Sequence, residues 1–257
     1  MNLSIGILGT LSIVDKEGRE WSPAALKQRV LLASLLTSHN RVIPVDDLMG
    51  WIWPETMPKT GRTAIQVYVS SLRKLFTRAS LMPNPLSIVT HSGGYMIKVL
   101  EEKYDLARFT AYLRNARQAE ARGDLKSASQ FLDRAIACWR GPALSDIRVT
   151  PRLEAEARRL EELRISALER RFHIDLSLGK ETDIVGEIYS ATVQYPFHEK
   201  FCCYLMTALH RQGRPADALR AYSDFRSAIQ DQLGLEPSVE LKRIQRSILV
   251  RGSTSTH

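Results

Sequence analysis

Cysteine is scarce in this sequence, and long apolar runs are missing. The three cysteines, Cys138, Cys202 and Cys203, are an odd number without metal-site spacing, which excludes a disulfide framework and a zinc module. No stretch approaches the roughly 18 consecutive apolar residues of a membrane span. The opening MNLSIGILGTLSIVD has no basic start and meets Asp15 early, so it predicts a strand and not a signal peptide. We expect a protein of the reducing cytoplasm with no membrane partner.

Motifs of catalysis are also missing. The segment LGKE lacks the upstream glycine and the Ser or Thr of a phosphate-binding loop, and neither a nucleophile elbow nor an HExxH motif occurs. His198, Cys202, Cys203 and His210 fall in one predicted helical hairpin, but adjacent cysteines point about 100° apart on a helix and cannot both face one metal ion. We therefore expect no catalytic, cofactor-binding or metal-binding residues, and no cofactor.

Acidic residues are absent from one segment of a basic chain. The formal net charge is +8, of which residues 1–100 hold +5 and residues 101–257 hold +3. Between Lys59 and Arg78 there are five basic residues and no acid. A local field of that sign attracts polyanions, because binding releases their counterions.

The first hundred residues mix short strands with helices. Two alternating runs, LSIGILG and LSIVD, predict an antiparallel pair, and Ser22 followed by Pro23 predicts a helix start with Ser22 as its N-cap. A short helix over VDDLMGWIW stops at Pro54, a third helix covers residues 60–76, and two strands flank Ser92-Gly93-Gly94. This order predicts an α+β domain, a winged helix-turn-helix with a small N-terminal sheet and a C-terminal hairpin wing. The apolar stripe expected to be core in the first helix is Leu26, Val30, Leu31 and Leu35.

The third helix, TGRTAIQVYVSSLRKLF, has two different faces. At 100° per residue its apolar stripe is Ile65, Tyr68, Val69, Leu72, Leu75 and Phe76. The opposite face holds Arg62, Thr63, Gln66, Val67, Ser70, Arg73, Lys74 and Thr77. Such side chains can pair with guanine or adenine edges or touch a thymine methyl in a major groove. The alternative is a merely solvated face, but an ordinary solvated helix mixes charges of both signs. The position before a Gly-Gly hairpin also favours a recognition helix.

The hairpin and two tryptophans offer further contacts. His91, Lys98 and the backbone at the two glycines are placed to reach a phosphate or a minor groove, and a solvated turn is the equal alternative. We expect Trp51 and Trp53 to be core residues, although an indole N–H at a helix end can donate to a phosphate.

Strand signals end at Tyr104, and a degenerate helical repeat follows. Gly123, Gly179 and Gly213 are each followed by a small or apolar residue five positions on and an apolar residue twelve positions on. The last two glycines are 34 residues apart, which is the tetratricopeptide period, whereas the first interval is 56. We predict an all-α, tetratricopeptide-like second domain. The expected limits are 1–100 for the first domain, 101–250 for the second, and 251–257 for a disordered tail.

Long motifs in both halves occur in the order of a known family. In the first half they are GILGTLSI, QRVLLASLLTSHNRVIPVDDLMGWIWPE, TAIQVYVSSLRKLF and GGYMIKV. In the second they are CWRGPALSDI, RLEELRISALERR, LMTALHRQGRPADALRAYSDFR and LGLEPSVELKRIQRSIL. The chain resembles, over about 240 residues, the small Streptomyces antibiotic regulatory proteins. In these an OmpR-type winged-helix domain precedes a bacterial transcriptional activation domain of tetratricopeptide-like helices.

The resemblance implies a specific function. Such proteins activate secondary-metabolite gene clusters, bind direct repeats beside a promoter as a head-to-tail pair, and recruit RNA polymerase through its sigma and alpha subunits. By position, Trp53 resembles a tryptophan that donates to a DNA phosphate, and Tyr95 lies where the wing tyrosine does. One departure is the turn HSGGYM, which lacks the arginine of many OmpR-type wings and puts minor-groove insertion in doubt.

Two other classes of protein stay open at this point. A sequence-nonspecific architectural DNA binder and a helical-repeat protein scaffold would both carry a basic winged helix. The resemblance covers no receiver or ATPase module, so we expect control by abundance and not by phosphorylation or nucleotide within this chain.

Overall fold

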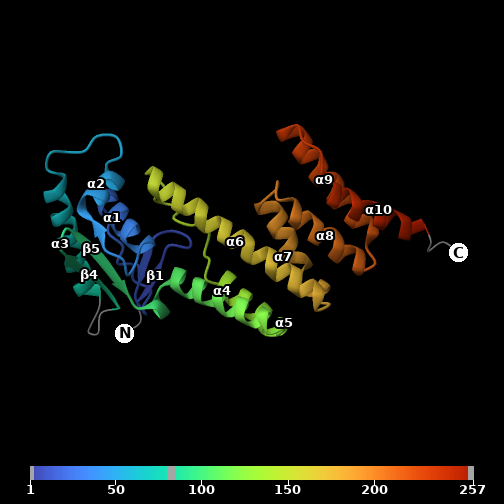
Figure 1. Cartoon of the computed structure of the whole chain (residues 1–257), viewed down its shortest axis with the longest axis horizontal. Helices are drawn as coiled ribbons and strands as arrows, with labels where there is room; N and C mark the ends of the chain where they lie inside the picture. The colour runs from blue at the N-terminus through green and yellow to red at the C-terminus, as the bar shows by residue number, and fades with distance from the viewer. Residues whose placement is uncertain (1–2, 80–84, 254–257) are drawn as a thin grey trace. The chain divides into compact units, whose positions relative to one another are not determined.

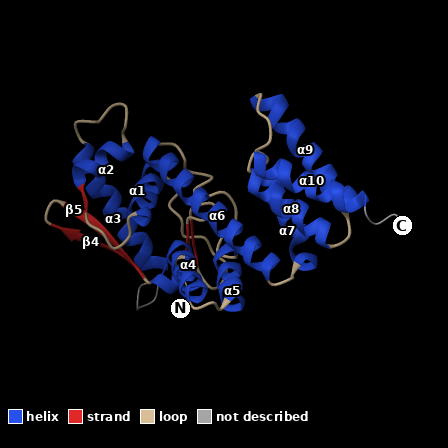
Figure 2. Cartoon of the chain, turned by 45° about the vertical axis from the view of Figure 1, so that its right-hand side comes forward, coloured by secondary structure: helices blue, strands red, loops and turns tan. Residues whose placement is uncertain are grey.

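The computed structural model describes residues 3–79 and 85–253, and of 251–253 only the backbone. By contacts the chain forms two compact units. One contains the chain up to Asn115 together with Asp133–Ile165, and the other contains Ala116–Leu132 and the chain from Ser166 on. Figure 1 labels the helices and strands, and Figure 2 separates helix from strand by colour.

The N-terminal strands form as predicted. Strands β1 (Ser4–Gly6) and β2 (Ser12–Val14) pair antiparallel, with Ile5 opposite Ile13. Both isoleucines are completely buried, which explains the alternation of the two runs.

Helix α1 (Leu26–Thr37) begins later than predicted, and two expectations about it are wrong. Ser22 is not the N-cap, because its hydroxyl accepts the Ile13 N–H at 3.1 Å and holds residues 20–22 against β2. The residue at the cap position is Ala25, which has no side-chain acceptor. Leu26 therefore lies in the first turn and is 49% exposed, whereas Val30, Leu31 and Leu35 are buried as expected.

Helix α2 (Val45–Ile52) ends at Trp53, just before Pro54, as the sequence predicts. Helix α3 (Gly61–Ala79) follows. Four residues of its predicted stripe are buried, and Tyr68 and Leu75 are half-buried at the edges of the stripe. The buried residues are Ile65, Val69, Leu72 and Phe76.

A three-stranded sheet contains the predicted hairpin. Strands β4 (Leu86–His91) and β5 (Gly94–Val99) pair around a two-residue turn, and the two-residue strand β3 (Ile43–Pro44), which was not predicted, completes the order β3-β5-β4. Gly93 has φ +81°, as expected for such a turn. Gly94 has a different requirement: a Cβ there would lie 2.3 Å from the Ile43 carbonyl oxygen. The hairpin turn is thus packed closely against β3.

The segment after the hairpin belongs to the first unit. After a 3-10 turn, η1 (Glu101–Lys103), the buried Tyr104 donates from its hydroxyl to the Leu36 carbonyl of α1 at 3.0 Å. The buried Asp105 carboxylate accepts the backbone N–H groups of Ile7 and Leu8 at 2.9 to 3.0 Å. These bonds explain why the first compact unit extends beyond the expected limit at residue 100. The expected domain limits themselves stay a prediction.

From Asp105 on, the described elements are helices. Their bounds are α4 (Asp105–Ala121), α5 (Leu125–Ile136), α6 (Pro151–Ser177), α7 (Glu181–Gln194), α8 (Glu199–Arg211), α9 (Pro215–Leu233) and α10 (Val239–Ser253). The division between the two units falls inside α4, α5 and α6. Helix α10 extends into the predicted tail as far as Ser253, and residues 254–257 lie outside the described residues.

The repeat glycines lie in the turns between helix pairs, as predicted. Gly123, Gly179 and Gly213 have φ of +73° to +74° and end α4, α6 and α8, positions that glycine occupies without steric cost. The residues five and twelve positions after each glycine are all buried: Ala128, Ile184, Ala218, Ala135, Ala191 and Phe225. Within the second unit α8 packs against α7, α9 and α10.

Candidate nucleic-acid interface

The outer face of α3 is open to solvent. All eight residues that the sequence assigns to it are exposed: Arg62, Thr63, Gln66, Val67, Ser70, Arg73, Lys74 and Thr77. Val67, in the middle of the helix, is 58% exposed, so this face presents an apolar side chain to solvent. Helix α3 contacts β4 of the β4–β5 hairpin (Figure 1).

The charge of this face differs in one respect from the sequence analysis. Helix α3 contains no acid, but Asp46 in the first turn of α2 lies 2.6 Å from the Arg62 guanidinium. Both side chains are more than half exposed, so water screens the pair and Arg62 can leave Asp46 for another anion at little cost. Lys74 has no ion pair within the described part of the chain. The charge of Lys74 is therefore available to a ligand, whereas the charge of Arg62 is partly neutralised by Asp46.

Arg73 is used within the protein. Its Nε donates to the Ile88 carbonyl at 3.0 Å, and its Nη2 donates to the Thr90 hydroxyl at 2.7 Å. Both acceptors lie on β4, so the guanidinium joins α3 to the hairpin. Thr77 is also engaged internally, since its hydroxyl donates to the Arg73 carbonyl at 3.0 Å.

The hairpin presents fewer contact residues than expected. His91 and Lys98 are exposed, but Tyr95 is only 8% exposed and lies opposite Ile43 in the sheet. Tyr95 is a core residue next to the hairpin turn, so its burial weighs against a DNA contact, and its expected role stays a prediction. The Gly93 carbonyl accepts the Val45 N–H at 2.9 Å, which fixes the turn to the start of α2.

The two tryptophans are half-buried at the end of α2. The centroid of the Trp53 ring lies 6.3 Å from that of Tyr68, and the Lys27 amine lies 5.9 Å from the Trp53 centroid. The Lys27 amine also donates to the Ile52 carbonyl at 2.7 Å. Trp51 stacks under the Arg152 guanidinium at 4.8 Å. Both rings thus pack internally and keep an exposed edge.

Sequence reasoning missed the partners of the two arginines. Asp46 lies 16 residues before Arg62, and Thr90 lies 17 residues after Arg73. Neither spacing is a helical repeat, so no local pattern identifies these pairs. They follow from the way α2, α3 and the hairpin pack.

The described residues also bear on metal binding, membrane insertion and thiol chemistry. Within residues 3–79 and 85–253, no group of three or more His, Cys, Asp or Glu side chains is arranged to hold a metal ion. None of the described helices combines the length and the hydropathy needed to cross a bilayer. Cys202 and Cys203 are buried, and burial raises the pKa of the Cys203 thiol to about 12.

Comparison with known proteins identifies the second half of the chain. The family model of the bacterial transcriptional activator domain matches residues 104–249. Regulatory protein DnrI of Streptomyces peucetius is 33% identical over 96% of this chain and 92% of its own length. Regulatory protein AfsR of Streptomyces coelicolor is 34% identical over 96% of this chain but only 24% of its own length.

A solved structure extends the likeness to the whole fold. The structure of Mycobacterium tuberculosis EmbR in complex with a low affinity phosphopeptide matches 97% of this chain with a TM-score of 0.84 and 31% identity. This chain covers 65% of that one.

Together these likenesses define the class, which is a bacterial regulator of transcription. More narrowly, the chain belongs to the Streptomyces antibiotic regulatory protein family of transcriptional activators, as its motifs led us to expect.

Proposed function

We propose that this protein is a sequence-specific activator that inserts α3 into the major groove of promoter DNA. In this proposal α1 to α3 and the β4–β5 hairpin act as an OmpR-type winged helix-turn-helix, and the later helices act as a tetratricopeptide-like activation domain. The observation that carries it is the outer face of α3, with eight exposed residues and no carboxylate along the helix. Helices with such a face enter the major groove in known DNA-binding motifs.

Within this face the residues divide by chemistry. Thr63, Gln66, Val67 and Ser70 are exposed, carry no charge and have the donors, acceptors or methyl groups that distinguish base edges. Arg62 and Lys74 carry the charge that holds phosphates. Arg73 acts mainly by holding the hairpin, and we assign it phosphate contact only through the donors that β4 leaves unused.

The flanking contacts are fewer. Trp53 and His91 remain proposed contacts, because each has an exposed part beside α3 or in the hairpin. Tyr95 and Thr77 are left out, the first because it is buried and the second because its hydroxyl is bonded within its own helix.

The wider proposal follows the family. We infer that two copies bind direct repeats head to tail beside the promoter of a secondary-metabolite cluster, in the cytoplasm, and recruit RNA polymerase through its sigma and alpha subunits. Transcription in vitro from such a promoter with purified holoenzyme tests recruitment. The protein should raise transcript yield, and removal of the direct repeats should abolish the effect.

A competition assay tests sequence-specific binding. Labelled promoter fragment and full-length protein are mixed at physiological salt with unlabelled promoter or random DNA as competitor. We expect a preference for promoter DNA of about 10³-fold or more. Equal competition by random DNA would indicate an architectural binder, and absence of binding to either would indicate a protein-interaction scaffold. Either result refutes the proposal.

A further inference from the structure

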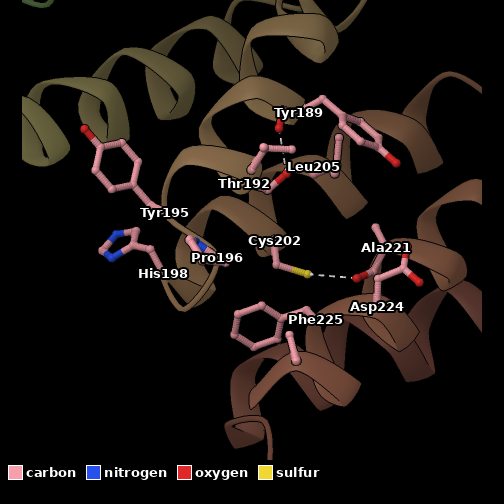
Figure 3. Close-up of a pocket in the computed structure, with 12 residues that line it drawn as sticks. Tyr189, Thr192, Tyr195, Pro196, His198, Cys202, Leu205, Ala221, Asp224 and Phe225 are labelled. Carbon is pink, nitrogen blue, oxygen red and sulfur yellow. Dashed lines mark hydrogen bonds between the residues drawn. The ribbon is translucent and has the colours of Figure 1, made fainter. Parts of the chain in front are cut away.

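The second unit contains an apolar pocket that the DNA-binding proposal does not use. It has a volume of about 230 Å³ and lies between α7, α8 and α9 (Figure 3). Its lining is mostly apolar and includes Tyr189, Tyr195, Phe225, Leu205 and Cys202. Small-molecule sites in proteins have this character, an apolar concave wall with a few polar groups.

Two polar side chains of the pocket, His198 and Cys202, already have partners within the protein. The His198 imidazole is 2.6 Å from the Glu169 carboxylate, which also accepts from Lys200 at 3.0 Å. The Cys202 thiol lies within 3.6 Å of the Ala221 carbonyl, and burial raises its pKa, so it stays a neutral thiol. Neither group needs a ligand.

Asp224 is different. It is the one carboxylate among the twelve residues that line the pocket, and it has no ion pair or hydrogen bond with any described residue. The negative charge of Asp224 acts inside the pocket. Together with burial, it raises the pKa of the Cys202 thiol. Figure 3 shows Asp224 and Cys202 on facing helices of the same pocket.

An unpaired carboxylate on the lining of an apolar pocket suits an organic cation that has an apolar body. The carboxylate attracts the positive charge, and the apolar lining buries the rest of the molecule. Tyr189, half exposed, stands at the rim, so a ligand can enter from solvent. We propose that this pocket binds a small molecule with an apolar body and one protonated amine, the amine at Asp224 and the body against Phe225 and Leu205.

Two probes of equal size test the charge requirement. 2-Phenylethylamine is protonated at neutral pH, and 2-phenylethanol is its neutral analogue. Each is titrated into the ¹⁵N-labelled full-length protein while amide chemical shifts are followed. We expect both to perturb α7, α8 and α9, with a Kd on the order of 1 mM for the amine and binding at least about threefold weaker for the alcohol.

Matched variants test the residue. Asp224→Asn should remove the preference for the amine, and Asp231→Asn, the same change on an exposed residue further along α9, should leave it intact. Ala228 is half-buried on the pocket lining, so Ala228→Leu should narrow the pocket and weaken the binding of both probes. Asp224 is exposed, so its variant should keep the native fold, and circular dichroism checks this directly.

Three results would overturn the proposal. The first is that the alcohol binds as well as the amine. The second is that the preference survives Asp224→Asn or is lost equally in Asp231→Asn. The third is that neither probe perturbs the pocket, in which case a protein segment is the better candidate for this surface.

Discussion

The Arg62 guanidinium on α3 lies 2.6 Å from the Asp46 carboxylate on α2, so an acid of the neighbouring helix is paired with one of the bases of the proposed DNA-binding face. An exposed pair of this kind contributes little to stability, but its carboxylate would repel an approaching phosphate. We expect Asp46→Asn to raise affinity for any DNA about two- to fivefold and to steepen the dependence on salt, because Arg62 is then free to hold a phosphate. Fluorescence anisotropy over a series of salt concentrations measures both effects.

The neighbouring Asp47 provides the control. It lies in the same first turn of α2 and is also exposed, but it has no ion pair among the described residues. Asp47→Asn removes the same charge and the same favourable interaction with the helix dipole. If both variants raise DNA affinity equally, the effect belongs to the general field and not to the Arg62 pair.

Arg73 and Lys74 are neighbours in sequence with different expected roles. Arg73→Lys keeps the charge but cannot reproduce the two-pronged bond to Ile88 and Thr90, so we expect a loss of about 1 kcal/mol in unfolding free energy together with weaker DNA binding. Lys74→Ala should leave the melting temperature unchanged and reduce the log–log salt slope of binding by about one. Equal loss of stability in both variants would contradict the role given to Arg73. Thermal unfolding and salt titration distinguish the cases.

Gly94, the first residue of β5 after the turn, should tolerate alanine poorly. A Cβ at this position would lie 2.3 Å from the Ile43 carbonyl oxygen, so the hairpin or β3 must move. We expect Gly94→Ala to lower the unfolding free energy by about 1 to 3 kcal/mol. Gly50→Ala on α2 is the control, because its Cβ meets no atom within 4 Å and alanine favours the helix. Urea unfolding of both variants checks the prediction, and equal stability of the two would refute it.

The sequence predicted periodic features well and contacts between elements poorly. Ile65, Val69, Leu72 and Phe76 follow the helical repeat, so their burial could be predicted from spacing alone. Tyr95 could not be placed, because its burial depends on pairing with the short strand β3, which has no alternating pattern of its own. Ser22 has the chemistry of an N-cap, but a longer-range bond to Ile13 competes for its hydroxyl and wins.

The proposed reading of bases can be separated from the holding of phosphates. Gln66→Ala and Val67→Ala remove side chains that are exposed and carry no charge, so neither should change the melting temperature or the salt slope of binding much. Each should instead change the relative affinity for operators that differ at one base pair, by about 1 to 3 kcal/mol where a good contact is lost. The measurement is competition among single-base operator variants at fixed salt. A uniform loss of affinity for every operator would show that these residues do not read bases.

His39 should make the stability of the first unit depend on pH. Its ring packs edge-on against Tyr104 at 5.1 Å, and burial holds the pKa of this histidine below its usual 6.5, although Glu101 and a bond to the Leu36 carbonyl act in the opposite direction. The unfolded chain therefore binds the proton more tightly than the folded one, and unfolding free energy should fall as pH is lowered from about 7.5 to 5.5. His39→Gln should reduce this slope, whereas His173→Gln, at an exposed position on α6, should leave it unchanged. Urea unfolding at the two pH values gives the slopes, and identical slopes for wild type and His39→Gln would rule out His39 as their source.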